Sequence, residues 1–203
     1  MRVSELSRAS GVSVPTIKYY LREGLLPFGA ASTAPNQADY ADTHVHRLRL
    51  IRVLTQLGGL SIAATRDVLA AIDDPRLPVP DLLGVVQRAM APARGADPQA
   101  RADVDRYLRR RRWTVPPDAP GRDALARALA ALRDLGRDVG ADVFAPYADL
   151  ADQLARREVA TIPANAARAE AVEAMVVGTV VFEAAFSALR RLAHARHAAR
   201  RFR

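Results

Sequence analysis

The stretch VSELSRASGVSVPTIKYYLREGLLP, residues 3–27, decides the fold of the first third of this 203-residue chain. Its first part carries Val3 and Leu6 on one face of a short helix. Gly11 then permits a tight turn, and Ser13 is of a residue type that caps the N-terminus of a helix. The spacing therefore predicts two short helices joined by a tight turn.

The second of these helices is predicted to have two unlike faces. Its buried side uses apolar residues and one of two adjacent tyrosines, namely Val14, Ile17, Leu21 and either Tyr19 or Tyr20. The opposite side offers Thr16, Lys18 and Arg22. A helix pair at this spacing matches a helix-turn-helix, whose second helix enters the major groove of DNA. A packed helical pair without such a role is the alternative that the spacing leaves open.

The same stretch resembles the reading head of the MerR family of transcriptional regulators. The resemblance continues through a wing-like segment, PFGAASTAPNQADY (27–40), and two helices in HVHRLRLIRVLTQLGGLSIAATRDVLAAID (44–73). It covers residues 1–74 and implies a winged helix-turn-helix with a small β-wing. In that family the second helix reads the major groove, the wing lies along the DNA backbone, and the following helix pair supports both. The implied function is sequence-specific regulation of transcription on double-stranded DNA.

The resemblance implies DNA-binding roles on the second helix. Ser13 and Thr16 fall where the family approaches base edges, and hydroxyl groups there are adaptable in what they accept. Lys18 and Tyr19 match the basic-Tyr-Tyr pattern that holds phosphates, and Arg22 lies one turn further along the exposed face. Phosphate contacts of this kind set the register on DNA rather than the sequence preference.

The resemblance also implies contacts from the wing, with one departure. Asn36, Gln37 and Tyr40 stand where the family shows an arginine-bearing segment that ends in tyrosine. Because that arginine is missing, the wing is expected to release fewer counterions and the salt dependence of binding to be shallower. Asn and Gln can still form hydrogen bonds with phosphates or bases.

Prolines divide the rest of the chain. Pro75, Pro78 and Pro80 break any helix in that segment and mark a boundary. We expect a DNA-binding domain over 1–74, a Pro-rich linker with a short helix over 75–97, and a helical effector-binding and dimerisation domain over 98–203. The later helices are predicted at about 81–90, 98–112, 122–135, 142–159 and 165–199, from apolar residues at helical spacing. The fold class is mainly α, a winged helix-turn-helix followed by an all-α domain.

The prolines also forbid the long coiled-coil helix with which typical members of the family dimerise. A homodimer on a palindromic promoter site is still expected, because a single small head binds DNA weakly. Its contact is predicted on the long last helix, at Val172, Val176, Val180 and Leu189. RNA polymerase is an expected partner at the promoter, with activation and repression both compatible with the sequence.

Five aromatic side chains and one methionine of the second half are candidates for an apolar pocket that binds a small-molecule effector. They are Trp113, Phe144, Tyr147, Met175, Phe182 and Phe186. An ordinary hydrophobic core is the alternative reading of the same residues. A regulator that works without a ligand, as an architectural or adaptor protein on DNA, stays open for the same reason.

Composition excludes several other classes. The net charge is +8, but the first 74 residues carry only +1, so most of the excess lies in basic stretches such as 107–113 and 190–203. Those stretches are expected to be solvated helix faces, with a secondary contact to the DNA backbone as the alternative. The chain has no cysteine, which removes disulfides and thiolate metal ligands, so no metal site and no cofactor are expected. His194 and His197 share a helix face but lack a nearby third ligand.

The sequence carries no phosphate-binding loop, zinc-protease motif or nucleophile elbow, so no enzyme is expected. A carboxylate pair hidden in the helical domain is the remaining enzymatic alternative. No uninterrupted apolar run approaches the roughly 18 residues of a membrane span, since Glu183 closes the longest run, 174–182. The N-terminus lacks the basic-then-apolar order of a signal peptide, so we expect a cytoplasmic protein without membrane contact.

Overall fold

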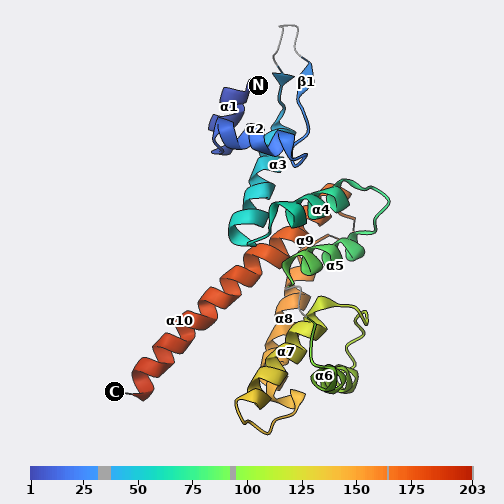
Figure 1. Ribbon diagram of the computed structural model, residues 1–203, viewed down its shortest axis with the longest axis vertical. Coiled ribbons are helices and arrows are strands. Elements are labelled where there is room, and N and C mark those ends of the chain that lie inside the picture. Colours follow the sequence, from blue (N-terminus) through green and yellow to red (C-terminus); the bar gives the residue numbers. More distant parts are fainter. Residues whose placement is uncertain (32–37, 92–94, 164, 203) are drawn as a thin grey trace. The chain divides into compact units, whose positions relative to one another are not determined.

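The computed structural model describes residues 1–31, 38–91, 95–163 and 165–202, and these are mainly helical (Figure 1). The elements in chain order are α1 Val3–Ser10, α2 Val14–Arg22, β1 Ala30–Ala31, β2 Ala38–Asp39, α3 Asp42–Arg52, the π-helical turn η1 Val53–Leu57, α4 Ile62–Asp73, α5 Val79–Met90, α6 Pro98–Arg110, α7 Pro120–Asp134, the 3₁₀ turn η2 Ala141–Phe144, α8 Ala145–Ala160, α9 Arg168–Val177, the π-helical turn η3 Gly178–Phe182 and α10 Glu183–Arg201. The predicted class, a helix-turn-helix followed by an all-α region, is confirmed.

The chain forms two compact units. The first joins Met1–Arg76 with Thr179–Arg203, and the second is Leu77–Gly178. This grouping differs from the expected division at residues 75–97 and 98–203. The expected linker holds α5, whose apolar face packs on α7 and α9 inside the second unit. The last helix leaves the second unit after Gly178 because Val180 is buried in the first.

The first unit is built on the core beneath α1 and α2. Leu6, Ile17, Leu25, Leu48 and Ile51 are fully buried, and α3 packs against α1 across them. Burying each of these side chains stabilises the unit by about 1.5–3 kcal/mol. The supporting helices therefore fix the position of α1, and α1 fixes that of α2.

The turn between α1 and α2 is closed by side-chain hydrogen bonds. Gly11 has φ +69°, a left-handed conformation that favours glycine. Ser7 Oγ donates to the Val12 carbonyl oxygen at 2.7 Å, and Ser10 Oγ donates to the Leu6 carbonyl oxygen at 2.7 Å. Because these bonds satisfy backbone groups that the end of α1 leaves unpaired, the turn is held in one geometry.

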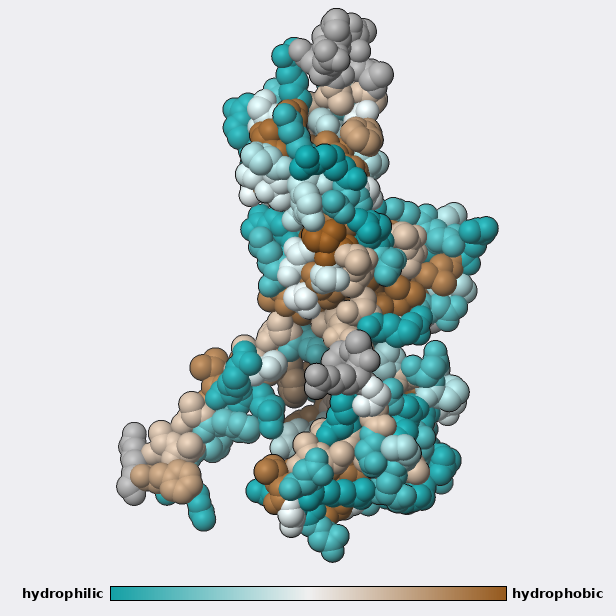
Figure 2. Space-filling view, viewed as in Figure 1, coloured by the Kyte–Doolittle hydropathy of each residue, from teal (hydrophilic) through white to brown (hydrophobic). Residues whose placement is uncertain are grey.

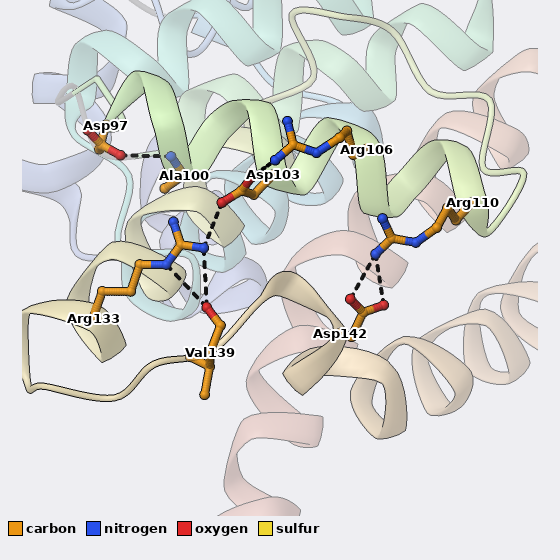
Figure 3. Close-up of polar contacts among 8 residues, drawn as sticks. All are labelled: Asp97, Ala100, Asp103, Arg106, Arg110, Arg133, Val139 and Asp142. Atoms are coloured by element: carbon orange, nitrogen blue, oxygen red, sulfur yellow. Dashed lines mark hydrogen bonds and ion pairs between the residues drawn. The ribbon is translucent and has the colours of Figure 1, made fainter.

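The second unit has its own core, between α6, α7 and the start of α8. Its buried residues are Ala100, Val104, Tyr107, Leu108, Ala126, Leu129, Ala141 and Ala148. Ion pairs surround this core. Asp103 bonds to Arg106 and Arg133, and Arg110 bonds to both oxygens of Asp142 (Figure 3). These pairs tie α6 to α7 and to η2.

The last helical run, Arg168–Arg201, is the one described helix that meets the length and composition of a membrane span. It contains an 18-residue window of mean hydropathy 1.7, of which only 17% is buried. The expectation that no segment approaches a spanning length was too strong, because it counted uninterrupted apolar runs, whereas a mean tolerates a few charges. Figure 2 shows apolar surface beside polar surface along α10.

Candidate nucleic-acid interface

Helix α2 buries one face and exposes the other. Ile17, Tyr20 and Leu21 are buried, which resolves the choice between the two tyrosines. Tyr19 is 37% exposed, and Lys18 lies on the same exposed side. The two rings lie 5.9 Å apart at 49°, so the buried ring of Tyr20 supports the exposed ring of Tyr19. The helix thus presents a cation and a phenol to solvent on a rigid base.

The N-terminus of α2 is capped as the sequence predicts. The Thr16 amide donates to Ser13 Oγ at 3.3 Å, and the Ser13 and Thr16 hydroxyl oxygens lie 2.7 Å apart in a hydrogen bond. Both side chains are reached from solvent. The cap therefore holds the Thr16 hydroxyl in place before any partner binds.

Two arginines of α3 hold the end of α1. Arg52 Nη1 donates to the Ser10 carbonyl oxygen at 3.3 Å, and Arg49 Nη2 donates to the Ala9 carbonyl oxygen at 3.4 Å. Positive side chains at the C-terminus of a helix also interact favourably with its dipole. Sequence reasoning did not identify these arginines, because their partners lie about 40 residues away in the chain.

Two more arginines hold the segment that follows α2. Arg47 Nε donates to the Leu25 carbonyl oxygen at 2.8 Å, while its Nη1 bonds to Asp73 at 2.6 Å. Arg66 bonds to both the carbonyl oxygen and the carboxylate of Glu23. Half of the basic side chains of the head are thus used internally, which singles out Lys18 and Arg22 as the cations on the exposed face of α2.

The base of the wing is a two-residue antiparallel ladder, in which Ala30 pairs with Asp39 and Ala31 with Ala38. Gly29 permits it, because a Cβ there would lie 2.5 Å from the Asp39 carbonyl oxygen. Asn36 and Gln37, two of the predicted DNA-binding residues, lie outside the described residues.

Tyr40, the third predicted contact of the wing, is buried at the wing's base. Its ring meets that of His44 edge to face at 5.2 Å, and burial raises the pKa of its hydroxyl. Its backbone pairs with that of Met1 in both directions at 2.8 Å. The position of Tyr40 supports the wing from within the head.

Comparison with known families identifies this head. The family described as MerR HTH family regulatory protein matches residues 1–72. The crystal structure of SCO5550, a candidate transcriptional regulator of Streptomyces coelicolor A3(2), is 36% identical, with a TM-score of 0.73 over 99% of this chain and 97% of that one. The chain belongs to the MerR family.

Two curated relatives of this MerR-family chain match in the head. The HTH-type transcriptional regulator HmrR of Sinorhizobium medicae (strain WSM419) is 40% identical over 70 residues, and the heavy metal-dependent transcription regulator 2 of Rhizobium meliloti (strain 1021) is 37% identical over 70 residues. In each case the match covers 34% of this chain and 46% of the relative. The chain therefore spans less than half the length of these curated relatives.

The candidate effector residues of the MerR-family chain are divided between the two units. Trp113 and Phe144 pack against the core of the second unit. Tyr147 of α8 is half exposed, and Met175 lies on α9. Phe182 and Phe186 belong to the first unit and are largely exposed. For Trp113 and Phe144 the structure favours a core role.

The four predicted dimer contacts differ in exposure. Val172, Val176 and Val180 are buried within the chain, so they are not available to a second copy. Leu189 is 65% exposed. The accessible apolar face of α10, which begins at the last residue of η3, consists instead of Phe182, Phe186, Leu189 and Leu192.

Proposed function

We propose that this MerR-family chain is a sequence-specific, DNA-binding transcriptional regulator of the cytoplasm, without enzymatic activity. The observation that supports it is the exposed face of α2, with Lys18, Tyr19 and Arg22 on a helix whose other face is fully buried. A rigid, basic helix face of this kind suits the major groove. In this proposal Ser13 and Thr16 approach base edges, while Lys18, Tyr19 and Arg22 hold phosphates. Asn36 and Gln37 of the wing assist them, and the buried Tyr40 supports the wing at its base.

Binding of the purified chain to a fragment of its own promoter, compared with a random duplex of equal length, tests this function. The titration is repeated across salt and protein concentrations, because phosphate contacts make affinity fall with salt. A strong preference for the promoter is the expected result. Equal binding to both duplexes would instead favour an architectural protein, and no binding at low salt would exclude the function.

The regulator is proposed to act as a homodimer on a promoter palindrome. Its second copy covers the exposed apolar face of α10, whose four large side chains recur at spacings of three and four residues. A two-fold dimer presents two heads to two half-sites. RNA polymerase is the proposed partner at the promoter, which the dimer either realigns by bending or occupies.

A small-molecule effector is proposed to act through the second unit. There the guanidinium of Arg111 lies 5.8 Å from the ring centre of Tyr107 and 5.7 Å from that of Trp113. The Tyr107 hydroxyl is buried beside this guanidinium, which also pairs with Asp149, so the cluster offers a hydroxyl group and a cation to a carboxylate or carbonyl ligand.

Thermal unfolding of the chain with a library of small organic acids and carbonyl compounds tests the effector. Stabilisation that is lost in Tyr107→Phe supports it, because only the hydroxyl is removed. Stabilisation that persists in that variant would place the effector elsewhere. No stabilisation by any compound would favour a regulator that works without a ligand.

A further inference from the structure

Phe28 is 75% exposed although it lies two residues after the buried pair Leu25 and Leu26. It lies in the irregular segment between α2 and β1. The exposure of Phe28 is informative because cationic and apolar side chains of α2 lie beside it.

Phe28 closes one end of an open groove along α2. The groove has a volume of about 520 Å³ and is lined by Val14, Pro15, Lys18, Leu21, Arg22 and Phe28. Lys18 and Arg22 are one helical turn apart, so both cations lie along the same side of it. The groove therefore combines an apolar floor with two positive side chains.

We infer that this groove holds the sugar-phosphate backbone of one DNA strand, with Phe28 packed against a deoxyribose between phosphates held by Lys18 and Arg22. The inference rests on the proposed function and assigns a DNA-contact role to Phe28. The DNA backbone alternates a charged phosphate with a largely apolar sugar, and the groove offers the matching alternation.

The groove is separate from the proposed base-reading edge of α2. At 3.6 residues per turn, Thr16 and Lys18 lie about 200° apart around the helix axis. Contacts in the groove are therefore expected to add affinity on every sequence. Loss of Phe28 removes apolar burial and leaves the phosphate contacts intact, whereas loss of Lys18 removes a phosphate contact and its counterion release.

The salt dependence of binding separates these two contributions. For Phe28→Ala in the full chain, affinity is expected to fall about ten-fold for each head, on promoter and random DNA alike, with an unchanged slope of log K against log salt. For Lys18→Ala the slope is expected to become shallower by about one for each head. Phe28→Leu, which keeps an apolar side chain, is expected to retain most of the affinity.

Two controls accompany the titrations. Phe202→Ala removes an equally exposed phenyl ring at the end of α10 and is expected to leave binding unchanged. Promoter DNA made with deoxyuridine in place of thymidine lacks the thymine methyl groups that an aromatic side chain can also contact. The loss of affinity caused by Phe28→Ala is expected to be the same on both DNAs, because the sugar is the same.

Unchanged affinity of Phe28→Ala, with the native chain bound to its promoter, would overturn the inference alone. If Phe28→Ala lost affinity only on thymine-containing DNA and not on deoxyuridine DNA, Phe28 would read the thymine methyl group, and the inference would be overturned. Absence of binding by the native chain would remove the proposed function and this inference with it. Thermal unfolding of Phe28→Ala is expected to match that of the native chain, because the side chain is exposed.

Discussion

Val180 lies directly against Gly58. A Cβ atom added at Gly58 would come within 3.1 Å of Val180 Cγ1 and within 2.7 Å of the Leu54 carbonyl oxygen. Gly58 ends the run of α3 and η1, and Val180 sits in the π-helical turn η3, fully buried. The turn η3 thus packs on the same helical run whose arginines hold α1. A π-helical turn inserts an extra residue into a helix, and such turns are frequent at functional sites.

Gly58→Ala is expected to destabilise the first unit by about 1–3 kcal/mol, because its Cβ meets backbone that cannot move aside. Thermal unfolding followed by circular dichroism measures the change. Gly121→Ala on α7 is the matched control, since nothing lies within 4 Å of the added carbon. A melting temperature equal to that of the native chain would show that Val180 and Gly58 are not in close contact.

Asp103→Asn is expected to destabilise the second unit near neutral pH and to have little effect in acid. The hydrogen bond from Arg133, aided by the positive charges of Arg106 and Arg133, holds the pKa of Asp103 below its usual range (Figure 3). A lowered pKa in the folded state contributes stability above the unfolded value of about 4, and this contribution is lost as pH falls through the lowered pKa.

Denaturant midpoints of the native chain and Asp103→Asn, measured from pH 7 down to pH 3, test this relationship. The gap between the two chains is expected to close as the pH falls below about 4. Asp152→Asn, which removes an exposed pair with Arg156 on α8, is expected to show no such gap. A gap that stays constant over the whole range would mean that ionisation of Asp103 is not what stabilises the unit.

Thr16→Ala is expected to change base preference, and Ser13→Ala to change it in the same direction. The 2.7 Å hydrogen bond between the two hydroxyl groups orients Thr16, so removal of either partner frees it. Ser13→Ala also removes the cap of α2, at about 1 kcal/mol. Affinities for a panel of single-base promoter variants measure the preference.

The double variant of Ser13 and Thr16 is expected to match Thr16→Ala in base preference, because coupled residues do not add. Lys18→Ala serves as the comparison, with a uniform loss on every member of the panel. Additive effects of the two hydroxyl substitutions would show that Ser13 and Thr16 act independently on DNA.

Local pattern was enough to predict the first two helices of the head and the turn between them. Gly11 and Ser13 act through their own backbone geometry and a cap two or three residues away, so a single sequence reveals both. Ser61 caps α4 through the Ala64 amide for the same reason. Most later helices begin within a few residues of their predicted starts, since prolines in the first turn mark them locally.

Contacts between distant segments could not be predicted in this way. Helical spacing predicts Val180 as a dimer contact. Only the fold shows that it is buried against Gly58, more than a hundred residues earlier. Arg47 likewise reads as a surface cation, although it bonds to the Leu25 carbonyl oxygen. The exposure of Phe28 is likewise visible only in the structure.

Leu189→Glu is expected to convert the dimer into a monomer. Leu189 is exposed in the single chain, so the substitution costs little in a monomer, but it would place a charge without a partner in the apolar contact between two copies of α10. Sedimentation equilibrium is expected to show a dimer for the native chain and at least a hundred-fold weaker association for the variant. Cooperative binding to the promoter is expected to be lost with it.

Ser187→Glu is the matched control, because it places the same charge on the opposite side of α10. Ser187 accepts a hydrogen bond from Arg191 at 3.3 Å, so a carboxylate there meets a cation one turn away. This variant is expected to remain a dimer. A native chain that sediments as a monomer would exclude the dimer, whereas a dimer that survives Leu189→Glu would place the contact between copies on a surface other than α10.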